Sequence, residues 1–419
     1  MHFLVSALGS AGDVHPFISI CQALQARGHE VRLIALAPFE ARVVRAGIPF
    51  TPLGSHADYE RLVQRAELWH PRRGARLLLD ELQARLREAH AVTVAALPPG
   101  RTVLVGSTLS WAMRLVQEQT GLPGATVHLA PFALRSAVCP PVLPGGLDLG
   151  WMPAAALHWL HEAAERLVLD RWIAPGLNRL RAELALSPVN RVLSRWMHSP
   201  DLVIGAWPAW FAAPQPDWPA QTVLTGFARF DEGGLPLDPG LRAFLDAGAA
   251  PVGITPGSAM AHGDRFFSRA LAACASLGRR ALLITPYADA LPKPLPPGVH
   301  QVGWAPFSQL LPRLAALVHH GGIGTSAQAL AAGVPQLVVP FAHDQFDNAA
   351  RLRRLGVAAT EHVARPTPAW TSTLGRLLGD PATAVATRRC AALSASATPG
   401  AALIAAQLER LERLAARPS

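Results

Sequence analysis

Residues 318–328, which read VHHGGIGTSAQ, place two histidines directly before three closely spaced glycines. Glycines at this spacing let a backbone approach a ligand closely, because they carry no side chain. The residues that follow have the pattern of a helix start, whose free N–H groups favour an anion. The stretch therefore predicts a phosphate site made by His320, Gly322, Gly324 and Thr325, with a plain tight turn as the alternative.

Metal binding is the other chemistry that paired histidines suggest. Neighbouring side chains on a strand point to opposite faces, so His319 and His320 would not share a metal ion. No carboxylate cluster is close to them in the sequence, and the four cysteines show no metal or redox spacing. We therefore expect no metal and no cofactor. The cysteines are Cys21, Cys139, Cys274 and Cys390.

Apolar segments and helical segments alternate on both sides of this turn. Short apolar runs predict strands, and longer runs with a helical period predict helices. The predicted strands are 2–8, 30–36, 48–53, 102–108, 124–130, 251–258, 280–286, 299–305, 315–322 and 335–342. The predicted helices are 14–25 and 73–96 in the first half, and in the second half helices that begin near residues 264, 325 and 345.

This alternation predicts two doubly wound α/β domains, because apolar strands separated by helices form a parallel sheet that is covered on both faces. The Gly- and Pro-rich segment DEGGLPLDPG lies between the two series. We expect an N-terminal domain at 1–228, a linker at 229–240, a C-terminal domain at 241–395 and a C-terminal helix at 396–419 that packs back on the N-terminal domain. Ligands of such sheets bind at the carboxyl ends of strands, where residues 9–16 and 319–325 fall.

The composition is that of a globular protein, with 50% apolar and 16% charged residues among 419. No apolar run reaches the roughly 18 residues that a membrane span requires, and the first residues read as a strand and not as a signal peptide. We expect a cytoplasmic protein, with peripheral association at the inner face of a membrane as the alternative. The net charge of +9 suits an anionic partner, but no arginine cluster interleaved with aromatics points to nucleic acid.

The run from Gly303 to Asn348 is similar to the donor-binding signature of family 1 glycosyltransferases, and the whole chain resembles these enzymes, which have the GT-B fold. The resemblance implies a nucleotide-diphosphate sugar as co-substrate. It also implies that Trp304, beside Ala305, stacks on the nucleobase. His320 and the glycine turn would hold the pyrophosphate.

Two further motifs of the family are present in this half of the chain. Asp344 and Gln345 match an acidic–Gln pair that binds the sugar hydroxyls. Ser258, in the segment TPGS, matches a serine that reaches the phosphates. A carboxylate and an amide placed together suit sugar hydroxyls, and a diphosphate leaving group requires stabilisation of its growing charge.

Two positions depart from the family pattern. Gln328 stands where many members have a Glu that grips both ribose hydroxyls, and Phe307 stands where many have Gln. A deoxyribose offers one hydroxyl fewer, so a neutral Gln is compatible with a dTDP-sugar. Some UDP-glucose members also lack this Glu, so a UDP-sugar stays open.

The segment GSAGDVHPF resembles the loop of the same family that carries the general base. The match places Gly12 at the family glycine and Asp13 at the base position, with His15 as the alternative base. The chemistry requires such a group, because the acceptor hydroxyl loses its proton as it attacks the anomeric carbon. Asp13 could instead cap the helix that follows. The glycines do not fit Gly-x-Gly-x-x-Gly, so a nicotinamide site is not predicted.

The region from about 131 to 218 is rich in proline and tryptophan and suits an apolar ligand pocket, with ordinary core packing as the alternative. Trp111, Phe132 and Trp151 are the candidate acceptor-pocket residues. Residues 170–219 resemble the rhamnosyltransferases of rhamnolipid synthesis, which join dTDP-rhamnose to a hydroxy fatty acid dimer.

The sequence thus predicts an inverting glycosyltransferase that moves a hexose, with L-rhamnose from dTDP-rhamnose favoured, to a hydroxyl of an apolar acceptor such as a hydroxy fatty acid. A UDP-glucose-dependent glucosyltransferase of natural products or sterols is the alternative within enzymes. A non-catalytic subunit that binds a nucleotide sugar is the alternative from another class. A nucleotide-sugar epimerase shares the two-domain architecture, but the tryptophan-rich region disfavours it.

Overall fold

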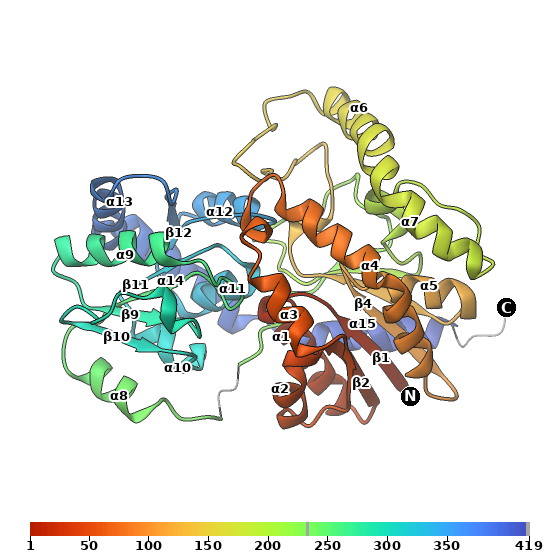
Figure 1. The fold of residues 1–419 in the computed structure, drawn as a ribbon, viewed down its shortest axis with the longest axis horizontal. Helices are drawn as coiled ribbons and strands as arrows, with labels where there is room; N and C mark the ends of the chain where they lie inside the picture. The colour runs from red at the N-terminus through yellow and green to blue at the C-terminus, as the bar shows by residue number, and fades with distance from the viewer. Residues whose placement is uncertain (232–233, 416–419) are drawn as a thin grey trace. The chain divides into compact units, whose positions relative to one another are not determined.

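A computed structural model describes residues 1–231 and 234–415 of the chain and divides them into two units (Figure 1). Unit 1 contains Met1–Leu62, Arg73–Arg229 and the chain from Thr398 onward, and unit 2 contains Val63–Arg72 and Phe230–Ala397. Residues 232 and 233 of the predicted linker, and 416–419 of the predicted C-terminal helix, lie outside the described residues.

Unit 1 is built on a seven-stranded sheet in which every pair of neighbouring strands is parallel, in the order β3-β2-β1-β4-β5-β6-β7. The central strands are buried along nearly their whole length, as expected where helices cover both faces. The strands are β1 (His2–Ala7), β2 (Glu30–Leu36), β3 (Phe50–Leu53), β4 (Thr102–Ser107), β5 (Gly124–His128), β6 (Leu202–Gly205) and β7 (Thr222–Leu224).

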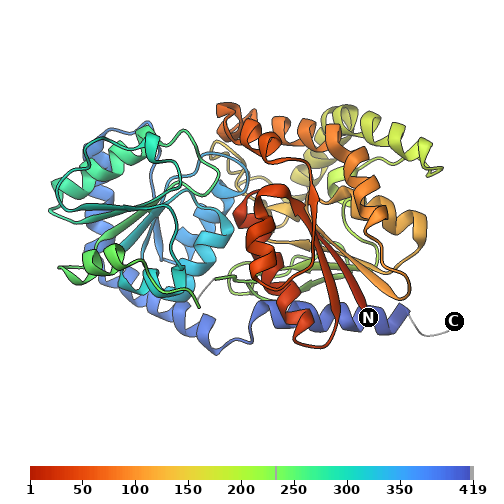
Figure 2. The ribbon, with the colours of Figure 1, turned by 60° about the horizontal axis from the view of Figure 1, so that its bottom comes forward.

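The helices of unit 1 follow the strands in the alternating manner that the sequence predicts (Figure 2). One face of the sheet packs on α4, α5 and α7 through a large apolar cluster that contains Leu104, Trp111 and Ile173. The helices are α1 (Ala11–Gln25), α2 (Glu40–Arg45), α3 (His56–Val63), α4 (Gly74–Ala95), α5 (Trp111–Thr120), α6 (Ala154–Ala164), α7 (Asp170–Glu183) and α15 (Gly400–Ala415).

Helix α1 begins three residues earlier than the apolar period predicts. Ser10 is its N-cap, and the Asp13 side chain accepts a hydrogen bond from the Ser10 backbone N–H at 2.7 Å. This capping box satisfies a donor that the helix start would otherwise leave unpaired, and it draws the first turn back to Ala11.

Unit 2 is built on a six-stranded parallel sheet in the order β10-β9-β8-β11-β12-β13. Its strands are β8 (Val252–Thr255), β9 (Ala281–Ile284), β10 (Val299–Val302), β11 (Ala316–His319), β12 (Gln336–Val338) and β13 (Ala358–Thr360). Its helices are α8 (Pro239–Asp246), α9 (Asp264–Ser276), α10 (Phe307–Leu310), α11 (Ile323–Ala332), α12 (Gln345–Arg354), α13 (Thr367–Gly379) and α14 (Pro381–Ser396).

Both faces of this second sheet are covered by apolar side chains. On one face Phe266 of α9 and Trp370 of α13 meet with their ring centroids 6.0 Å apart. On the other face Leu317 of β11 packs with Leu310 of α10 and Ala329 of α11. The predicted doubly wound α/β architecture is therefore confirmed in each unit.

The segment Val63–Arg72 departs from the predicted division, because it groups with unit 2 and not with the N-terminal half of the chain. The His343 Nε2–H donates to the Leu68 carbonyl at 3.0 Å, and the Trp69 ring meets the His343 ring edge-on at 5.9 Å. The His262 Nε2–H donates to the Gln64 carbonyl at 2.8 Å. Local sequence patterns do not report contacts between residues this far apart in the chain.

Helix α15 packs against α1 within unit 1. The Glu409 carboxylate of α15 accepts two hydrogen bonds from the Arg27 guanidinium, at 2.7 and 2.8 Å, and lies 2.8 Å from the His29 Nε2. The paired guanidinium is the main cause that lowers the pKa of Glu409 to about 2.

We expect Glu409→Gln to lower the Tm at neutral pH by a few degrees, because a charge-assisted pair is lost. The ionised carboxylate stabilises the fold above its ordinary pKa of 4.5, and this contribution is lost as the pH falls towards about 2. The Tm difference between the wild type and the variant should therefore shrink between these two pH values. Glu183→Gln is the matched control, because Glu183 pairs with Arg87 at the surface and such pairs contribute little.

A difference in Tm that stayed the same at pH 7 and pH 3 would contradict this assignment. Thermal melts followed by circular dichroism across the pH range measure it.

In the described part of the chain, no single helix has both the length and the apolar character needed to cross a membrane. Residues Pro381–Ser396 and Gly400–Leu411 meet the length and composition test only as a pair, and that pair is bent by 42°.

Candidate functional site

The turn between β11 and α11 holds the two adjacent histidines in different environments. His319 is fully buried, its Nε2 lies 3.0 Å from Gln336 Oε1, and its Nδ1 accepts from the Gly321 N–H at 3.2 Å. Burial lowers the pKa of His319 to about 3, so the ring is neutral and its donor and acceptor are both used. His319 is therefore a structural residue of this turn.

The neighbouring His320 has an unused polar atom. Its Nδ1 is buried and has no hydrogen-bond partner among the described residues. The ring is held in a narrow space, because a Cβ at Gly322 would lie 2.3 Å from Nε2 and a Cβ at Gly257 would lie 2.8 Å from Cε1. Burial lowers the pKa of His320 to about 4, so the neutral ring can donate one N–H to a ligand.

The start of α11 adds backbone donors beside this histidine. Gly322 is the N-cap, so the first-turn N–H groups, including those of Gly324 and Thr325, have no partner inside the helix. Gly321 has a φ of +92°, and a Cβ there would lie 2.8 Å from the Val338 side chain, so the turn requires glycine. Together with His320, these groups form a cradle suited to an anion.

Three further predicted donor-binding residues lie on loops of the same unit. Ser258 is exposed and directly follows Gly257, whose backbone borders the His320 ring. Trp304 follows β10 and is 39% exposed, which leaves ring surface open to a flat partner. Ala305 beside it is buried.

Gln328, on the second turn of α11, has part of its amide committed. Its Nε2–H donates to the Phe230 carbonyl at 3.0 Å, which ties the chain before α8 to this helix. The amide oxygen and the second N–H are the parts left for a ligand. An amide offers one acceptor oxygen where a carboxylate offers two.

Asp344 and Gln345 stand at the start of α12, where the structure uses both side chains. Asp344 Oδ2 accepts from the Asn348 Nδ2–H at 2.7 Å. Gln345 is buried, and its Oε1 accepts the backbone N–H groups of Phe341 and Ala342 at 2.8 and 3.1 Å. The predicted sugar contact of Gln345 is thereby narrowed to its amide nitrogen.

Sequence reasoning missed Asn348 as a member of this site. Its Nδ2–H groups donate both to Asp344 Oδ2 and to the Gly321 carbonyl at 2.9 Å, so it joins the acidic residue to the glycine turn. Its Oδ1 is buried without a partner in the described structure. The signal in the sequence was the spacing of four residues from Asp344, which places the two side chains on one face of a helix.

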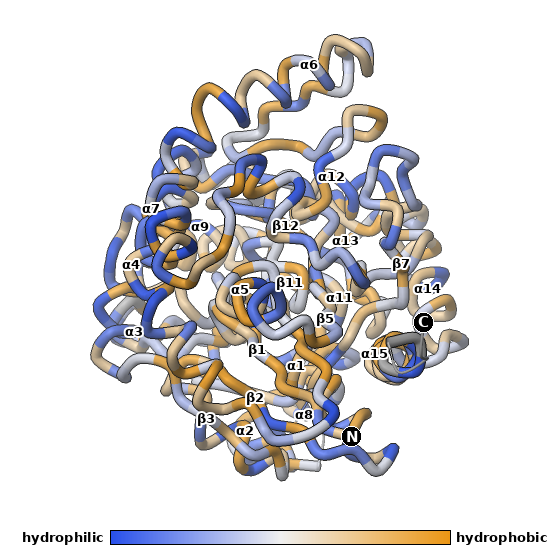
Figure 3. The backbone as a smooth tube through the Cα atoms, turned by 90° about the vertical axis from the view of Figure 1, so that its right-hand side faces the viewer, coloured by the Kyte–Doolittle hydropathy of each residue, from blue (hydrophilic) through white to orange (hydrophobic). Residues whose placement is uncertain are grey.

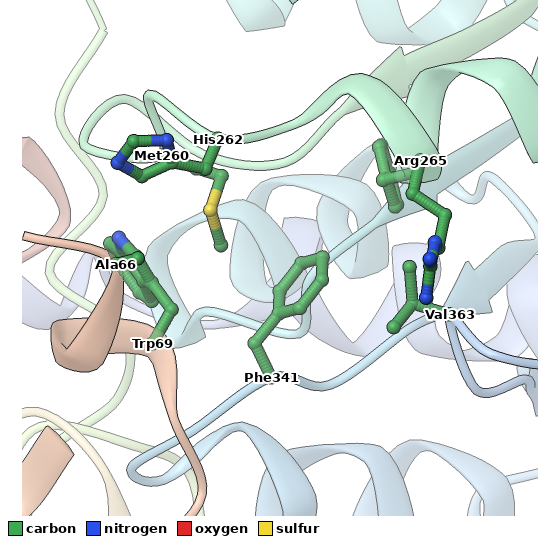
Figure 4. Close-up of a pocket in the computed structure, with 8 residues that line it drawn as sticks. Ala66, Trp69, Met260, His262, Arg265, Phe341 and Val363 are labelled. Carbon is green, nitrogen blue, oxygen red and sulfur yellow. The ribbon is translucent and has the colours of Figure 1, made fainter. Parts of the chain in front are cut away.

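A pocket of about 220 Å³ also lies in unit 2 and was not predicted (Figure 4). Apolar side chains make most of its wall, and the Trp69 indole N–H is buried there without a partner among the described residues. The lining residues are Ala66, Trp69, Met260, His262, Arg265, Phe266, Phe341 and Val363. Trp69 contacts His343, the residue directly before Asp344, so this pocket borders the α12 start.

In unit 1 the first turn of α1 holds the Asp13 carboxylate close to the Ser10 backbone. Asp13 Oδ2 accepts from the Ser10 N–H at 2.7 Å and from the Ser10 hydroxyl at 3.0 Å, while Oδ1 has no partner in the described structure. A Cβ at Gly9 would lie 2.3 Å from Oδ2, so only glycine leaves room for this carboxylate. Gly12, one residue before, lies in the first turn of α1. Burial raises the pKa of Asp13.

His15 has a different environment. Its Nε2 lies 2.7 Å from the Arg42 Nη1, and because a guanidinium only donates, Nε2 accepts that bond. Burial and the nearby Arg42 charge lower the pKa of His15 to about 3. The Nε2 lone pair of His15 is therefore already engaged by Arg42, which makes His15 the less available of the two candidate bases.

The three candidate acceptor-pocket residues are not brought together. Trp111 is 1% exposed and packs edge-on against Trp196 at 5.9 Å in the core, so its ring faces core side chains in this structure. Trp151 is 79% exposed on the surface. Phe132 is half-buried in a short turn after β5. Composition predicted aromatic content here, but it could not separate core rings from surface rings.

Comparison with known proteins identifies the class. Residues 3–139 match the glycosyltransferase family 28 N-terminal domain, and residues 281–411 match the erythromycin biosynthesis protein CIII-like, C-terminal domain. The chain is 31% identical to O-mycaminosyltylonolide 6-deoxyallosyltransferase of Streptomyces fradiae, over 93% of this chain and 92% of the relative.

Solved structures agree on the fold. The glycosyltransferase of kitacinnamycin matches with a TM-score of 0.72 at 22% identity, over 98% of each chain. The glycosyltransferase VinC, solved in complex with dTDP, matches with a TM-score of 0.68 at 20% identity, over 99% of this chain and all of the other. The two-domain fold, the glycine turn after β11 and the similar glycosyltransferases together define a nucleotide-sugar-dependent glycosyltransferase.

The chain belongs to the glycosyltransferase family of the natural-product type that has an erythromycin CIII-like C-terminal domain. This confirms the predicted enzyme class and the GT-B fold. The narrower resemblance to rhamnosyltransferases of rhamnolipid synthesis, and the roles of the individual site residues, stay predictions.

Proposed function

We propose that this glycosyltransferase transfers a 6-deoxyhexose, with L-rhamnose favoured, from a dTDP-sugar to a hydroxyl of an apolar acceptor such as a hydroxy fatty acid. The observation that carries the donor part is the anion cradle of unit 2. A buried, unpartnered His320 Nδ1 lies beside the free N–H groups of the α11 start. Leaving such a donor unpaired costs free energy unless a ligand completes it, and a diphosphate has the oxygens to do so.

The choice of dTDP is supported by the state of Gln328. Its Nε2–H donates to the Phe230 carbonyl, and its neutral amide stands at the sequence position where many family members have a carboxylate. One acceptor oxygen suits a deoxyribose, which has a single ring hydroxyl. The names of two similar proteins agree with this choice, since one transfers a 6-deoxyallosyl group and the other was solved with dTDP.

The proposed chemistry is a single displacement with inversion. Asp13 accepts the proton of the acceptor hydroxyl, and the hydroxyl oxygen forms a bond to the anomeric carbon. The bond from that carbon to the diphosphate breaks, and His320 with the α11 N–H groups stabilises the leaving charge. Ser258 contributes a hydroxyl to the phosphates, and Trp304 stacks on the nucleobase.

Asp344 and Gln345 orient the sugar in this scheme. Asp344 is held by Asn348, and Gln345 offers its amide nitrogen, so the pair presents one acceptor and one donor. Sugar hydroxyls can pair with both kinds of group. Because many hexoses share these hydroxyls, the choice of L-rhamnose rests on the resemblance to rhamnolipid rhamnosyltransferases.

A thermal-shift panel with dTDP, UDP, GDP and their sugars tests the donor. A ligand at 100 times its Kd adds roughly 2.7 kcal/mol to the free energy of unfolding, which shifts the melt measurably. We expect dTDP-rhamnose to shift the melt and UDP-glucose to leave it unchanged. A shift with UDP-glucose alone would replace the proposal with glucosylation of natural products.

Turnover assays then separate an enzyme from a silent binding subunit. The purified chain with dTDP-rhamnose and a 3-hydroxyacyl acceptor should release dTDP and form a glycoside of inverted configuration. Donor binding without turnover for every acceptor tested would instead support the non-catalytic alternative.

A further inference from the structure

The helical arm of unit 1 and the loop before it carry exposed apolar side chains, of which only Trp151 is also a candidate acceptor-pocket residue. Helix α6 continues through a π turn at Glu165–Leu169 into α7. Figure 1 shows α6 at the end of this arm, away from the sheet of its own unit. Among the described residues, six of the thirteen strongly exposed large apolar side chains lie between 138 and 168. They are Val138, Leu147, Trp151, Trp159, Leu167 and Val168.

Two of the exposed side chains, Trp159 and Leu167, share one face of the arm. Leu157 and Glu165 are eight residues apart, and both are fully buried, which marks the inner face. Trp159 and Leu167 are also eight residues apart, but they are 71% and 58% exposed, so they share the outer face. The tube coloured by hydropathy shows apolar and polar positions alternating along α6 (Figure 3). An amphipathic helix with its apolar side turned to solvent is unusual in a folded monomer.

The carboxylates around the π turn of the arm are paired and largely buried. Glu165 accepts from the Arg135 guanidinium at 2.7 Å and from the Ser194 N–H at 2.8 Å. Asp170 accepts from the backbone N–H groups of Arg191 and Val192, at 2.7 and 3.1 Å.

Glu162 pairs with Arg166 at 3.2 Å and with Arg191. The exposed charged groups of α6 and α7 are Arg166, Arg171, Arg179 and Glu183, so cations outnumber carboxylates there. Arg166 pairs with Glu162, and Glu183 pairs with Arg87. Asp148, in the loop before Trp151, is the exposed carboxylate at the edge of this surface.

These features are those of a membrane-surface helix. Tryptophan prefers the interface between lipid and water, because its ring is apolar and its N–H is polar. A helix with an apolar face and arginines beside it lies in the plane of an anionic bilayer. The formal net charge of +9 adds a long-range attraction to such a surface.

We infer that the outer face of this arm, formed by Trp151, Trp159, Leu167 and Val168 and flanked by Arg166 and Arg171, docks the enzyme on the interface of an anionic lipid bilayer. The charge of the arm decides between a bilayer and a second copy of the chain. A second copy would bring the same arginines face to face, and like charges at an interface oppose association. Anionic head groups neutralise them instead. The inference rests on unit 1 alone and does not require the proposed donor or acceptor.

The test is flotation of the full chain with vesicles in a density gradient. We expect it to float with vesicles of phosphatidylcholine mixed equally with phosphatidylglycerol, and not with phosphatidylcholine alone. Higher salt should weaken the binding, because salt screens the arginines. The double variant Trp151→Ser/Trp159→Ser should bind the anionic vesicles at least about tenfold more weakly, because two interfacial rings are lost.

Matched control variants test whether the loss of any exposed apolar side chain, and not only of those on the arm, weakens vesicle binding. Val44→Ser and Val385→Ser remove apolar side chains that are exposed to nearly the same extent as Leu167 but lie elsewhere, and both variants should float like the wild type. The Tm of the double variant and its shift with dTDP should match those of the wild type, which shows that the fold and the donor site are intact.

Two results would overturn the inference. One is a wild-type chain that does not float with the anionic vesicles, or a double variant that floats equally well. The other is light scattering that shows a dimer in the wild type and a monomer in the double variant, with no effect of lipid on either, because the face would then bind a second copy.

Discussion

Asp13→Asn should lower kcat by about a thousandfold, because the acceptor hydroxyl loses the group that takes its proton. The substitution keeps the shape of the side chain. An asparagine oxygen can still accept from the Ser10 N–H that Asp13 now binds at 2.7 Å, so α1 should start at the same residue. The Tm and the affinity for dTDP should therefore change little, and single-turnover kinetics with a saturating donor measure the effect.

The matched control is Ser10→Ala, which removes the hydroxyl that donates to Asp13 Oδ2 at 3.0 Å but leaves the carboxylate in place. We expect this variant to lose some stability and to retain most of its turnover. Nearly normal turnover in Asp13→Asn would show that Asp13 only caps the helix. His15 would not readily replace it as the base, because its pKa of about 3 leaves the ring a weak proton acceptor.

The pH dependence gives an independent readout of the same group. Burial raises the pKa of Asp13, so the carboxylate is protonated at a higher pH than an exposed aspartate. The ionised form is the base, and kcat/KM should rise with pH through this raised pKa and then level off. In Asp13→Asn this acid limb should be absent from the residual activity, whereas a purely structural role would leave it in place.

Local patterns in the sequence were enough for the architecture and for the tight glycine turn after β11, whose phosphate role stays a prediction. Strand-to-helix alternation is a local property. The close approach of the backbone to the His320 ring is also local, because only glycines allow it. The motif alone also gives the position of Asp13 after the first strand, and its role as the base stays a prediction. These predictions depend on residues within about ten positions of one another.

What could not be predicted depends on distant contacts. The commitment of the Gln345 oxygen to a backbone turn, and the pocket beside Trp69, arise from the way loops meet in the fold. The exposure of a tryptophan has the same origin. Trp111 and Trp151 are identical in type, but helix packing buries the first and leaves the second on the surface.

His320→Ala should weaken dTDP binding by about 10- to 100-fold, because a hydrogen bond to a charged phosphate contributes about 1.5–3 kcal/mol. Isothermal titration with dTDP measures the change. Without ligand, His320→Ala should lower the free energy of unfolding by less than the truncation of a buried side chain normally does. The reason is that the wild type already bears the cost of a buried Nδ1 without a partner, which the variant removes.

Two further variants test the geometry of this cradle. His320→Asn places an amide N–H near the position of Nδ1, and it should retain more affinity than His320→Gln, whose longer side chain places its N–H near Nε2. Gly322→Ala keeps the histidine but adds a Cβ 2.3 Å from its Nε2, so the ring must move and affinity should fall. If all these variants bound dTDP like the wild type, the diphosphate would not lie at this turn. The buried Nδ1 would then be a cost that no ligand offsets, which is rare for a polar atom in a native fold.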